Sequence, residues 1–380
     1  TVQETVYKGD LSVQDFIDLY YEKKKKEKDG VTKNNGGCNH CTGENQSIVD
    51  RELMSALVDC YMVKTDGSNL DLMSVHGINE EESTLTNNNY VFAPNYSYRN
   101  LTDHLKKHLK LGLNYLTHTT VYKIQWCAQR NLFLINGGQF TADHIIVTVP
   151  LKQLQLNTIQ FLPELPREKQ VIINDYFSME TGMKVVARFK KPFWKKHNTS
   201  AIPPHRLVFV PNHPIIAQFW FSNLINDDKI HGQEYVVTGF STASRTDYVS
   251  KNQLSNQQVI DSFVELLYEV YGVEKSRGEA LFIDGVVFDW RRDNLFVGGA
   301  YSCPKVRPDG TPVIKDPRSE LGKPIEFKHT HNNGKCGKLV FAGEATHPTQ
   351  CSTVQGALES GEIAVNYLKG DLDTRTHSRL

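Results

Sequence analysis

The tetrapeptide GEAT at 343–346 has the residue types of a ligand-binding turn. It follows the apolar run 339–342, which is typical of a buried strand, and it precedes a helix whose pattern begins near 352. Gly343 permits a tight turn or the close approach of a ligand, and Ser352 with Gln355 has the spacing of a capping box. Free N–H groups at a helix start attract anions, so the segment suits either a nucleotide-type cofactor or an ordinary strand–helix connection.

Cysteine and histidine offer two weaker signals. Cys38 and Cys41 have half of a zinc-binding spacing, but no second pair follows at the distance of a zinc finger, so a loop without metal is the favoured interpretation. His347 follows the GEAT turn, where a structural role is favoured over catalysis. We therefore predict no metal site.

Composition excludes several classes of protein. The 380 residues carry 43 Lys and Arg against 43 Asp and Glu, so no basic excess indicates a nucleic-acid partner. No run of 18 apolar residues occurs, which predicts no membrane-spanning helix. Seven cysteines are too few for a disulfide scaffold, and without a secretory leader they favour a reducing compartment.

The elements that must position these residues follow from periodicity. Helical patterns cover 12–28 and 47–63, and the basic run 23–28 is interpreted as a solvated helix end rather than a partner-binding patch. Alternating or continuous apolar runs predict strands at 117–126, 131–138, 142–150 and within 181–250.

The later part of the chain contains two further helices. The pattern at 256–272 places Val259, Phe263, Leu266 and Val270 on one stripe, and Gly272 stops the helix. Residues 303–337 are interpreted as a long connection, which leads into the strand before GEAT and the helix after it.

Four stretches resemble one enzyme family. The run 339–368 (LVFAGEATHPTQCSTVQGALESGEIAVNYL) resembles the C-terminal flavin-binding segment of the FAD-dependent amine oxidases, and it is most similar to their polyamine oxidase branch, which includes spermine oxidase and the N1-acetylpolyamine oxidases. The segments 117–154, 182–194 (GMKVVARFKKPFW) and 288–302 (FDWRRDNLFVGGAYS) resemble further parts of that family.

The resemblance implies an α/β fold with two domains. A discontinuous, Rossmann-like FAD domain would use 94–152 and 335–370, and an α+β substrate domain would combine the helical 1–93 with a mixed sheet in 153–334, leaving 371–380 as a tail. The family's N-terminal strand–G-x-G-x-x-G–helix unit has no counterpart in these 380 residues. Because the chain also begins at Thr1, we expect a fragment or a processed chain.

The resemblance also implies how FAD would be held, without a covalent bond. Glu344, in the turn with Gly343 and Ala345, would bind the ribityl or ribose part of FAD. Thr353 and Val354 would face the flavin at the start of the last helix, where a helix dipole stabilises negative charge. The backbone of Val121 would meet the adenine.

Lys184 matches the family lysine that holds a water against flavin N5. In a strand, Lys184 shares one face with Val186 and Arg188, and on spacing alone it would be an exposed lysine. The surrounding motif favours the catalytic role.

The implied reaction is the oxidation of a polyamine, either N1-acetylspermine and N1-acetylspermidine or spermine. Hydride would pass from carbon to flavin N5, water would hydrolyse the imine, and O₂ would reoxidise the flavin to give H₂O₂. The alternative is a catalytically inactive fragment or paralogue that acts as a binding or assembly protein.

The substrate side departs from the family pattern. Tyr301 and Ser352 match it, but Cys303 and Cys351 stand where relatives carry aromatic residues that cage the amine. We expect weaker or altered amine binding, and a reducing compartment disfavours a disulfide between these two cysteines.

The chain ends in Ser378-Arg379-Leu380, a variant of the S-K-L peroxisomal address. It predicts a peroxisomal enzyme recognised by the import receptor, with the cytoplasm as the alternative location.

Overall fold

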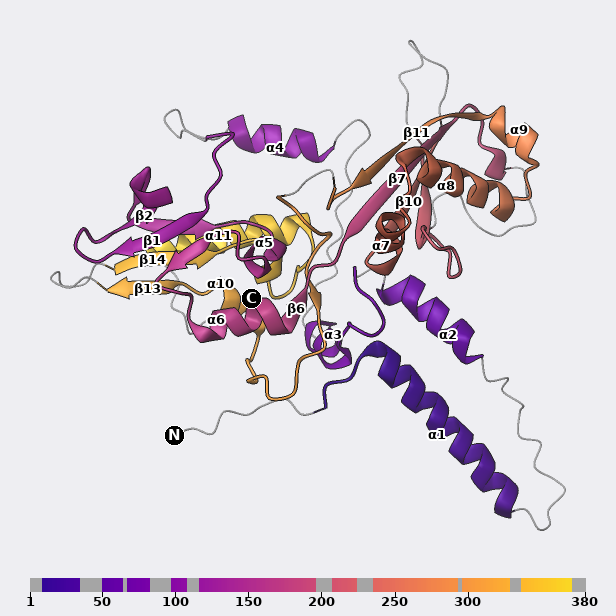
Figure 1. Cartoon of the computed structure of the whole chain (residues 1–380), viewed down its shortest axis with the longest axis horizontal. Helices are drawn as coiled ribbons and strands as arrows, with labels where there is room; N and C mark the ends of the chain where they lie inside the picture. The colour runs from indigo at the N-terminus through magenta and orange to yellow at the C-terminus, as the bar shows by residue number, and fades with distance from the viewer. Residues whose placement is uncertain are drawn as a thin grey trace.

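The computed structural model describes residues 9–34, 50–63, 67–82, 97–107, 116–195, 207–223, 235–292, 296–328 and 336–370. Two lobes lie side by side in Figure 1, and each is built around its own hydrophobic core. The five-stranded lobe contains β7 to β11, and the β4–β14 lobe contains the remaining longer strands.

The five-stranded lobe is an antiparallel sheet with one face covered by a helix. Its strands lie in the order β11 (Phe282–Asp289), β7 (Gly182–Phe189), β10 (Tyr235–Thr242), β9 (Gln218–Asn223) and β8 (Val208–Phe209). Helix α8 (Asn256–Val270) packs its fully buried Phe263 and Leu267 against the side chains that alternate inward from β7. The lobe also holds α7 (Ser244–Lys251), α9 (Lys275–Glu279) and the short helix η4 (Phe193–Lys195).

The predicted stripe of α8 is correct for three of its four residues. Val259, Phe263 and Leu266 are buried, but Val270 is 43% exposed. Val270 is the last helical residue, and Gly272 then turns the chain with φ +58°.

The β4–β14 lobe combines two sheets over one core. One sheet has the order β3 (Phe140–Ala142), β2 (Leu132–Ile135), β1 (Lys123–Cys127) and β5 (Gln160–Leu162), and the other has β13 (Ile325–Lys328), β14 (Cys336–Phe341) and β4 (His144–Val147). Strands β4 and β14 run parallel, and helix α11 (Val354–Lys369) packs on them through Ala364 and Tyr367. Shorter elements complete the lobe: η2 (Asn136–Gly138), α5 (Leu151–Gln155), α6 (Arg167–Val171), η3 (Ile172–Tyr176), β6 (Phe177–Ser178), β12 (Cys303–Pro304), α10 (Pro317–Gly322) and η5 (Glu344–Thr346).

Hydrophobic packing crosses the predicted domain boundaries. Ile159, Ile172 and Tyr176 belong to the same core as Val147 and Leu339, although the sequence assigned 153–334 to the other domain. The interpretation of 303–337 as a plain connection is wrong, because β12, α10 and β13 lie within it. The division into domains itself stays a prediction.

The N-terminal helices are α1 (Val13–Asn34), α2 (Arg51–Val58), the π-helix η1 (Asp59–Val63), α3 (Val75–Glu82) and α4 (Tyr98–Lys107). A small third core joins Val13, Ile17, Val63 and Met73 to Cys303. This segment is therefore packed against the rest of the chain, while the far end of α1 extends outward in Figure 1.

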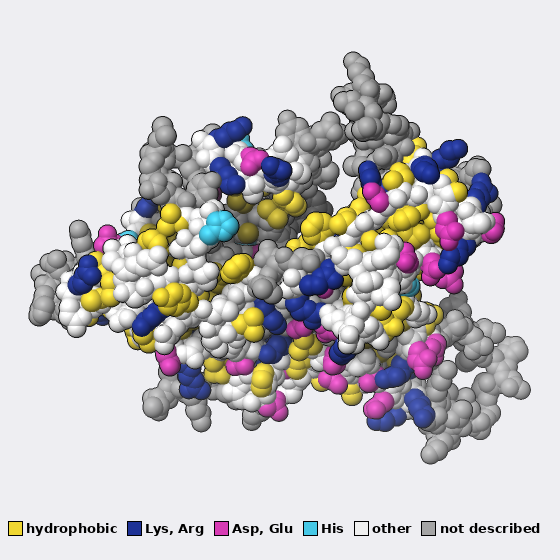
Figure 2. Space-filling model, turned by 45° about the horizontal axis from the view of Figure 1, so that its top comes forward, with side chains coloured by type: hydrophobic (Ala, Val, Ile, Leu, Met, Phe, Trp, Pro, Cys, Tyr) yellow, Lys and Arg dark blue, Asp and Glu magenta, His cyan; other side chains and the backbone are white. Residues whose placement is uncertain are grey.

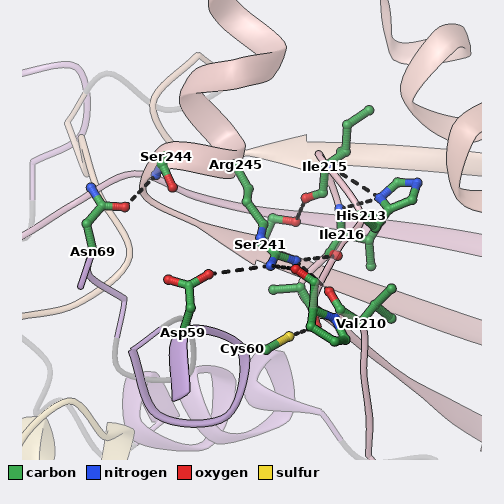
Figure 3. A network of polar contacts seen from close by, with 12 residues as sticks. Asp59, Cys60, Asn69, Val210, His213, Ile215, Ile216, Ser241, Ser244 and Arg245 are labelled. Carbon is green, nitrogen blue, oxygen red and sulfur yellow. Dashed lines mark hydrogen bonds and ion pairs between the residues drawn. The ribbon is translucent and has the colours of Figure 1, made fainter. Parts of the chain in front are cut away.

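A buried arginine ties η1 to the five-stranded lobe (Figure 3). Arg245 donates hydrogen bonds to the carbonyl oxygens of Val210, Pro211 and Ile216 at 2.7 to 2.9 Å, and it pairs with Asp59 at 3.4 Å. These contacts attach the helical N-terminal part to the turn between β8 and β9.

His213 organises the same turn and makes it sensitive to acid. Its Nδ1 accepts hydrogen bonds from the backbone N–H groups of Ile215 and Ile216, at 3.2 and 2.9 Å, and can do so only while unprotonated. Burial, and then the charge of Arg245, lower the pKa of His213 to about 4.

We expect the free energy of unfolding to fall as the pH drops from about 6.5 towards 4. In that window the unfolded chain takes up a proton at His213 that the folded chain does not, so the stability present above pH 6.5 is lost. Denaturant titrations at several pH values measure the slope. In His213→Asn, whose side-chain oxygen keeps the acceptor without titrating, that part of the slope should vanish. An unchanged slope would contradict the assignment.

On the face shown in Figure 2, charged side chains do not form an extended patch of one sign. Lys and Arg alternate with Asp and Glu on both lobes, and hydrophobic side chains form a band on the lobe that contains α8 and α9. Among the described residues, no helix has the length and hydropathy needed to cross a bilayer.

Candidate functional site

The GEAT turn sits at the carboxyl ends of the parallel strands β4 and β14. Gly343 adopts φ +138°, which side chains rarely allow, and its N–H donates to Ser360 Oγ on α11 at 2.8 Å. A cavity of about 260 Å³ opens beside it, lined by 147–151 after β4 and by 342–346 after β14. Crevices at the carboxyl ends of parallel strands are where α/β folds bind nucleotide ligands.

The carboxylate of Glu344 is held at three points. Its Oε1 accepts from the backbone N–H of Ser302 at 3.1 Å, and its Oε2 accepts from Ser302 Oγ at 2.6 Å and from Ser352 N–H at 3.0 Å. A carboxylate offers about four acceptor positions. One position therefore remains for a donor such as a ligand hydroxyl.

Helix α11 begins one residue later than the predicted capping box. Thr353 is the N-cap, and its hydroxyl oxygen accepts from Gly356 N–H at 3.1 Å. Ser352 instead adopts φ +59° and donates its hydroxyl to the carbonyl oxygen of Ser302 at 2.7 Å. The predicted box is wrong because Ser352 is engaged by Glu344 and Ser302.

Gly356 allows the loop before α11 to pack against the helix. A Cβ at this position would lie 1.9 Å from the carbonyl oxygen of Gln350. We expect Gly356→Ala to lower the free energy of unfolding by about 2–3 kcal/mol, because backbone atoms must move apart. Chemical denaturation measures the change.

Gly361→Ala is the matched control, since no atom lies within 4 Å of a Cβ there. It should be neutral or stabilise the protein by up to about 1 kcal/mol, the usual gain for Ala over Gly in a helix. Equal losses in the two variants would contradict the packing argument.

His347 has the structural role favoured from sequence. Its Nδ1 accepts from the N–H groups of Thr349 and Gln350 at 3.3 and 3.0 Å, and its Nε2 contacts Glu359 on α11 at 3.0 Å. The imidazole thus fastens the loop after GEAT to the helix.

Lys184 lies on the face of the five-stranded sheet that α8 does not cover. Its Nζ is 5.6 Å from the ring centre of Trp220 and 5.8 Å from that of Trp290. Phe240 and Phe288 are its partners in register on the neighbouring strands. Burial lowers the pKa of Lys184, because the charged form loses water.

The strand that carries Lys184 starts next to a residue of the cavity wall. A Cβ at Gly182 would be 2.8 Å from the Cβ of Ala300, and Ala300 lines the cavity wall. The N–H of Trp290 donates to the Gly182 carbonyl at 3.1 Å. Lys184 follows two residues later, about 7 Å along the strand. The GEAT turn and the aromatic surroundings of Lys184 therefore belong to one region.

The comparison with protein families agrees with this geometry. Residues 21–368 match the family described as flavin containing amine oxidoreductase. The chain belongs to this family. The resemblance to the FAD-dependent amine oxidases, inferred from four stretches of the sequence, is thereby confirmed.

Two curated members of the family illustrate the relationship. The peroxisomal N(1)-acetyl-spermine/spermidine oxidase of Bos taurus is 28% identical over 234 residues, which is 60% of this chain and 42% of the bovine protein. Polyamine oxidase 2 of Arabidopsis thaliana is 43% identical over 243 residues, which is 60% of this chain and 39% of the plant protein. The chain thus spans about two fifths of the length of these relatives.

Solved amine oxidases share the fold. A putrescine oxidase bound to putrescine has a TM-score of 0.62 at 14% identity, covering 84% of this chain and 65% of that protein. The cyclohexylamine oxidase of Brevibacterium oxydans has a TM-score of 0.57 at 16% identity, with coverages of 84% and 64%. These likenesses confirm the predicted two-domain α/β fold.

The residues present fit part of a flavin cofactor, and FAD is the cofactor expected in this family. Gly343 leaves open space where a side chain would stand, and Glu344 keeps one acceptor position beside the cavity. Ala345 lines the same cavity. Among the described residues, no cluster of His, Cys, Asp or Glu is placed to hold a metal ion, and Cys38 and Cys41 lie outside them.

The other predicted site residues are distributed around this centre. Tyr301 packs against Gly67, and Val354 is 38% exposed on α11. Val121 packs against the core of the β4–β14 lobe and does not line the cavity. Cys351 is buried next to Ser352.

Cys303 is placed differently from the expectation of a substrate cage. It is 1% exposed and its side chain packs in the third core with Val63 and Met73.

Sequence reasoning missed two residues that hold Glu344 in place, Ser302 as its direct partner and Arg318 behind it. Arg318 lies on α10, whose start does carry a sequence signal. Asp316 caps the helix by accepting from Ser319 N–H, and Pro317 follows at the first helical position.

Proposed function

We propose that the chain supplies the C-terminal flavin-binding segment and the substrate sheet of an FAD-dependent polyamine oxidase. The substrate would be N1-acetylspermine or N1-acetylspermidine, with spermine as the other candidate. The observation that carries the proposal is the pairing of a pre-oriented Glu344 at the cavity with Lys184 on the strand that begins next to a residue of the cavity wall. The acetylated substrates are favoured by relatives named for them.

FAD would be held without a covalent bond by the turn and by the start of α11. Glu344 would accept a hydroxyl of the cofactor, with Gly343 and Ala345 allowing close approach. Thr353 and Val354 would present the helix N-terminus to negative charge, and Val121 would meet the adenine. Bound there, the flavin would supply an acceptor for a hydride equivalent, with O₂ as the final oxidant.

The open face of the five-stranded sheet would receive the amine. Trp220, Phe240, Phe288 and Trp290 surround Lys184 and offer apolar contacts to the methylene chain of a polyamine. Burial lowers the pKa of Lys184, because the charged form loses water, and its Nζ would position a water beside the flavin. Tyr301, Ser352 and Cys351 would border the same space. Cys303 would support it from the core.

Flavin uptake tests the proposal. The purified chain is incubated with FAD, passed through a desalting column and examined for the visible flavin band. We expect the band to be retained and to bleach when N1-acetylspermine is added without O₂, with H₂O₂ formed once air returns. Spermine in a parallel cuvette decides between the substrates.

A chain that stays colourless under these conditions would contradict the proposal. It would favour the alternative of an inactive binding or assembly protein. Retained colour without bleaching by any polyamine would contradict the catalytic part alone.

Peroxisomal import also stays a proposal. Two relatives are named peroxisomal, and Ser378, Arg379 and Leu380 lie outside the described residues. Fluorescence of a tagged chain in cells, with and without the last three residues, measures it.

A further inference from the structure

Arg318 is among the largest fully buried side chains of the described structure. It is 2% exposed, and its guanidinium lies 4.3 Å above the ring of Phe177. Burying a guanidinium is costly unless hydrogen bonds satisfy it. Arg318 donates hydrogen bonds to Ser302 and to the carbonyl oxygen of Ala345, both beside Glu344.

Ser302 is the node between this arginine and the carboxylate. Arg318 Nη1 donates to Ser302 Oγ at 2.6 Å, and Nη2 donates to the Ser302 carbonyl at 3.4 Å. The same hydroxyl donates to Glu344 Oε2 at 2.6 Å, and the Ser302 N–H donates to Oε1. The three side chains form one chain of hydrogen bonds from α10 to the GEAT turn.

The direction of this chain follows from the donors available. An arginine has donors only, so the Ser302 oxygen must accept from it. The single hydroxyl proton is then left to point at Glu344, and each bond polarises the next. The positive charge of Arg318 thus lies two hydrogen bonds from the carboxylate of Glu344, and the remaining acceptor position of that carboxylate is kept oriented.

We propose that Arg318 is a positioning residue for the cofactor, acting through Ser302 to hold Glu344 as an acceptor for a hydroxyl of FAD. This inference rests on the proposed function, because it assumes that flavin binds at the GEAT turn. Arg318 itself touches the carboxylate only through Ser302, so its effect on binding should depend on the hydroxyls of the ligand.

The test compares two ligands in equilibrium binding. FAD carries the ribityl and ribose hydroxyls, whereas lumiflavin has the ring system without them. We expect Ser302→Ala and Arg318→Met each to weaken FAD binding by roughly 10- to 100-fold, the usual range for a hydrogen bond to a charged group. The affinity for lumiflavin should stay within about twofold of the wild-type value. The double variant should lose little more FAD affinity than either single variant, since both substitutions break the same series of hydrogen bonds.

Ser319→Ala is the matched control. Ser319 follows Arg318 on α10, is 8% exposed, and its hydroxyl has no hydrogen-bond partner among the residues that the structure describes. Its removal should leave the affinity for both ligands unchanged. Arg318→Lys, which keeps a donor and the charge, should recover part of the FAD affinity that Arg318→Met loses.

Three outcomes would overturn the proposal. Unchanged FAD affinity in Ser302→Ala would show that the hydrogen bonds from Arg318 through Ser302 to Glu344 do not position the cofactor, while leaving the proposed function intact. Equal losses for FAD and lumiflavin would assign Arg318 a purely structural role. A wild-type chain that binds neither ligand would remove the proposed function and this inference together. Thermal unfolding of each variant separates lost affinity from lost fold, and Ser302→Ala carries the test if Arg318→Met does not fold.

Discussion

Lys184→Met is expected to lower the rate of amine oxidation by about 100-fold or more, the usual effect of removing a group that handles a proton or a water at the reacting atoms. Methionine keeps an unbranched apolar stem beside Trp220 and Trp290 and removes the Nζ that lies over their rings. The loss should therefore appear in the turnover of bound amine rather than in flavin content. Single-turnover kinetics of the FAD-loaded protein under N1-acetylspermine measures it.

The control for this variant is Lys191→Met, which makes the same substitution just beyond the end of β7. Lys191 is exposed, whereas the pKa of Lys184 is lowered by burial. Lys191→Met should leave the rate unchanged. If Lys184→Met retained full activity with flavin bound, the assignment of this lysine would be wrong.

Asp10→Ala is expected to have the largest effect on stability, a loss of about 3–5 kcal/mol. Asp10 and Arg307 form an ion pair at 3.1 Å whose side chains are 0% and 2% exposed. The carboxylate also accepts from the N–H of Arg307 and from Ser74 Oγ. Its removal takes away the carboxylate that pairs with this buried guanidinium, and chemical denaturation should show the loss directly.

Asp284→Ala provides the comparison. Its partner Arg188 and Asp284 itself are 39% and 55% exposed, so water screens the pair. Breaking it should cost no more than about 1 kcal/mol. If Asp10→Ala and Asp284→Ala lowered the free energy of unfolding by similar amounts, burial of the Asp10–Arg307 pair would not be the source of its stabilising effect.

Local pattern predicted the elements that carry the site. The alternation along β7 places Lys184 on the open face and Val185 in the core, as expected from period two. The strand, turn and helix around GEAT could likewise be predicted, because Gly343 and the apolar run before it are local signals.

Contacts between residues far apart in the chain could not be predicted from the sequence. Glu344 meets Ser302 across 42 positions, and Ser302 meets Arg318 across 16. No spacing rule connects such residues, since only the packing of α10 against η5 brings them together. The misplaced helix cap has the same cause, because a tertiary partner of Ser352 overrode the local capping pattern.

The pairing of β14 with β4 has a consequence for how the polypeptide is made. His144 lies opposite Lys338, so the parallel pair joins residues 194 positions apart. At bacterial or eukaryotic translation speeds, about 5–20 residues per second, this interval lasts roughly 10–40 s. The antiparallel strands between 182 and 289 can assemble during that time, since their contact order is lower. The GEAT turn is thus completed only after these antiparallel strands have been synthesised, and the nascent chain must keep one edge of β4 from aggregating until β14 arrives.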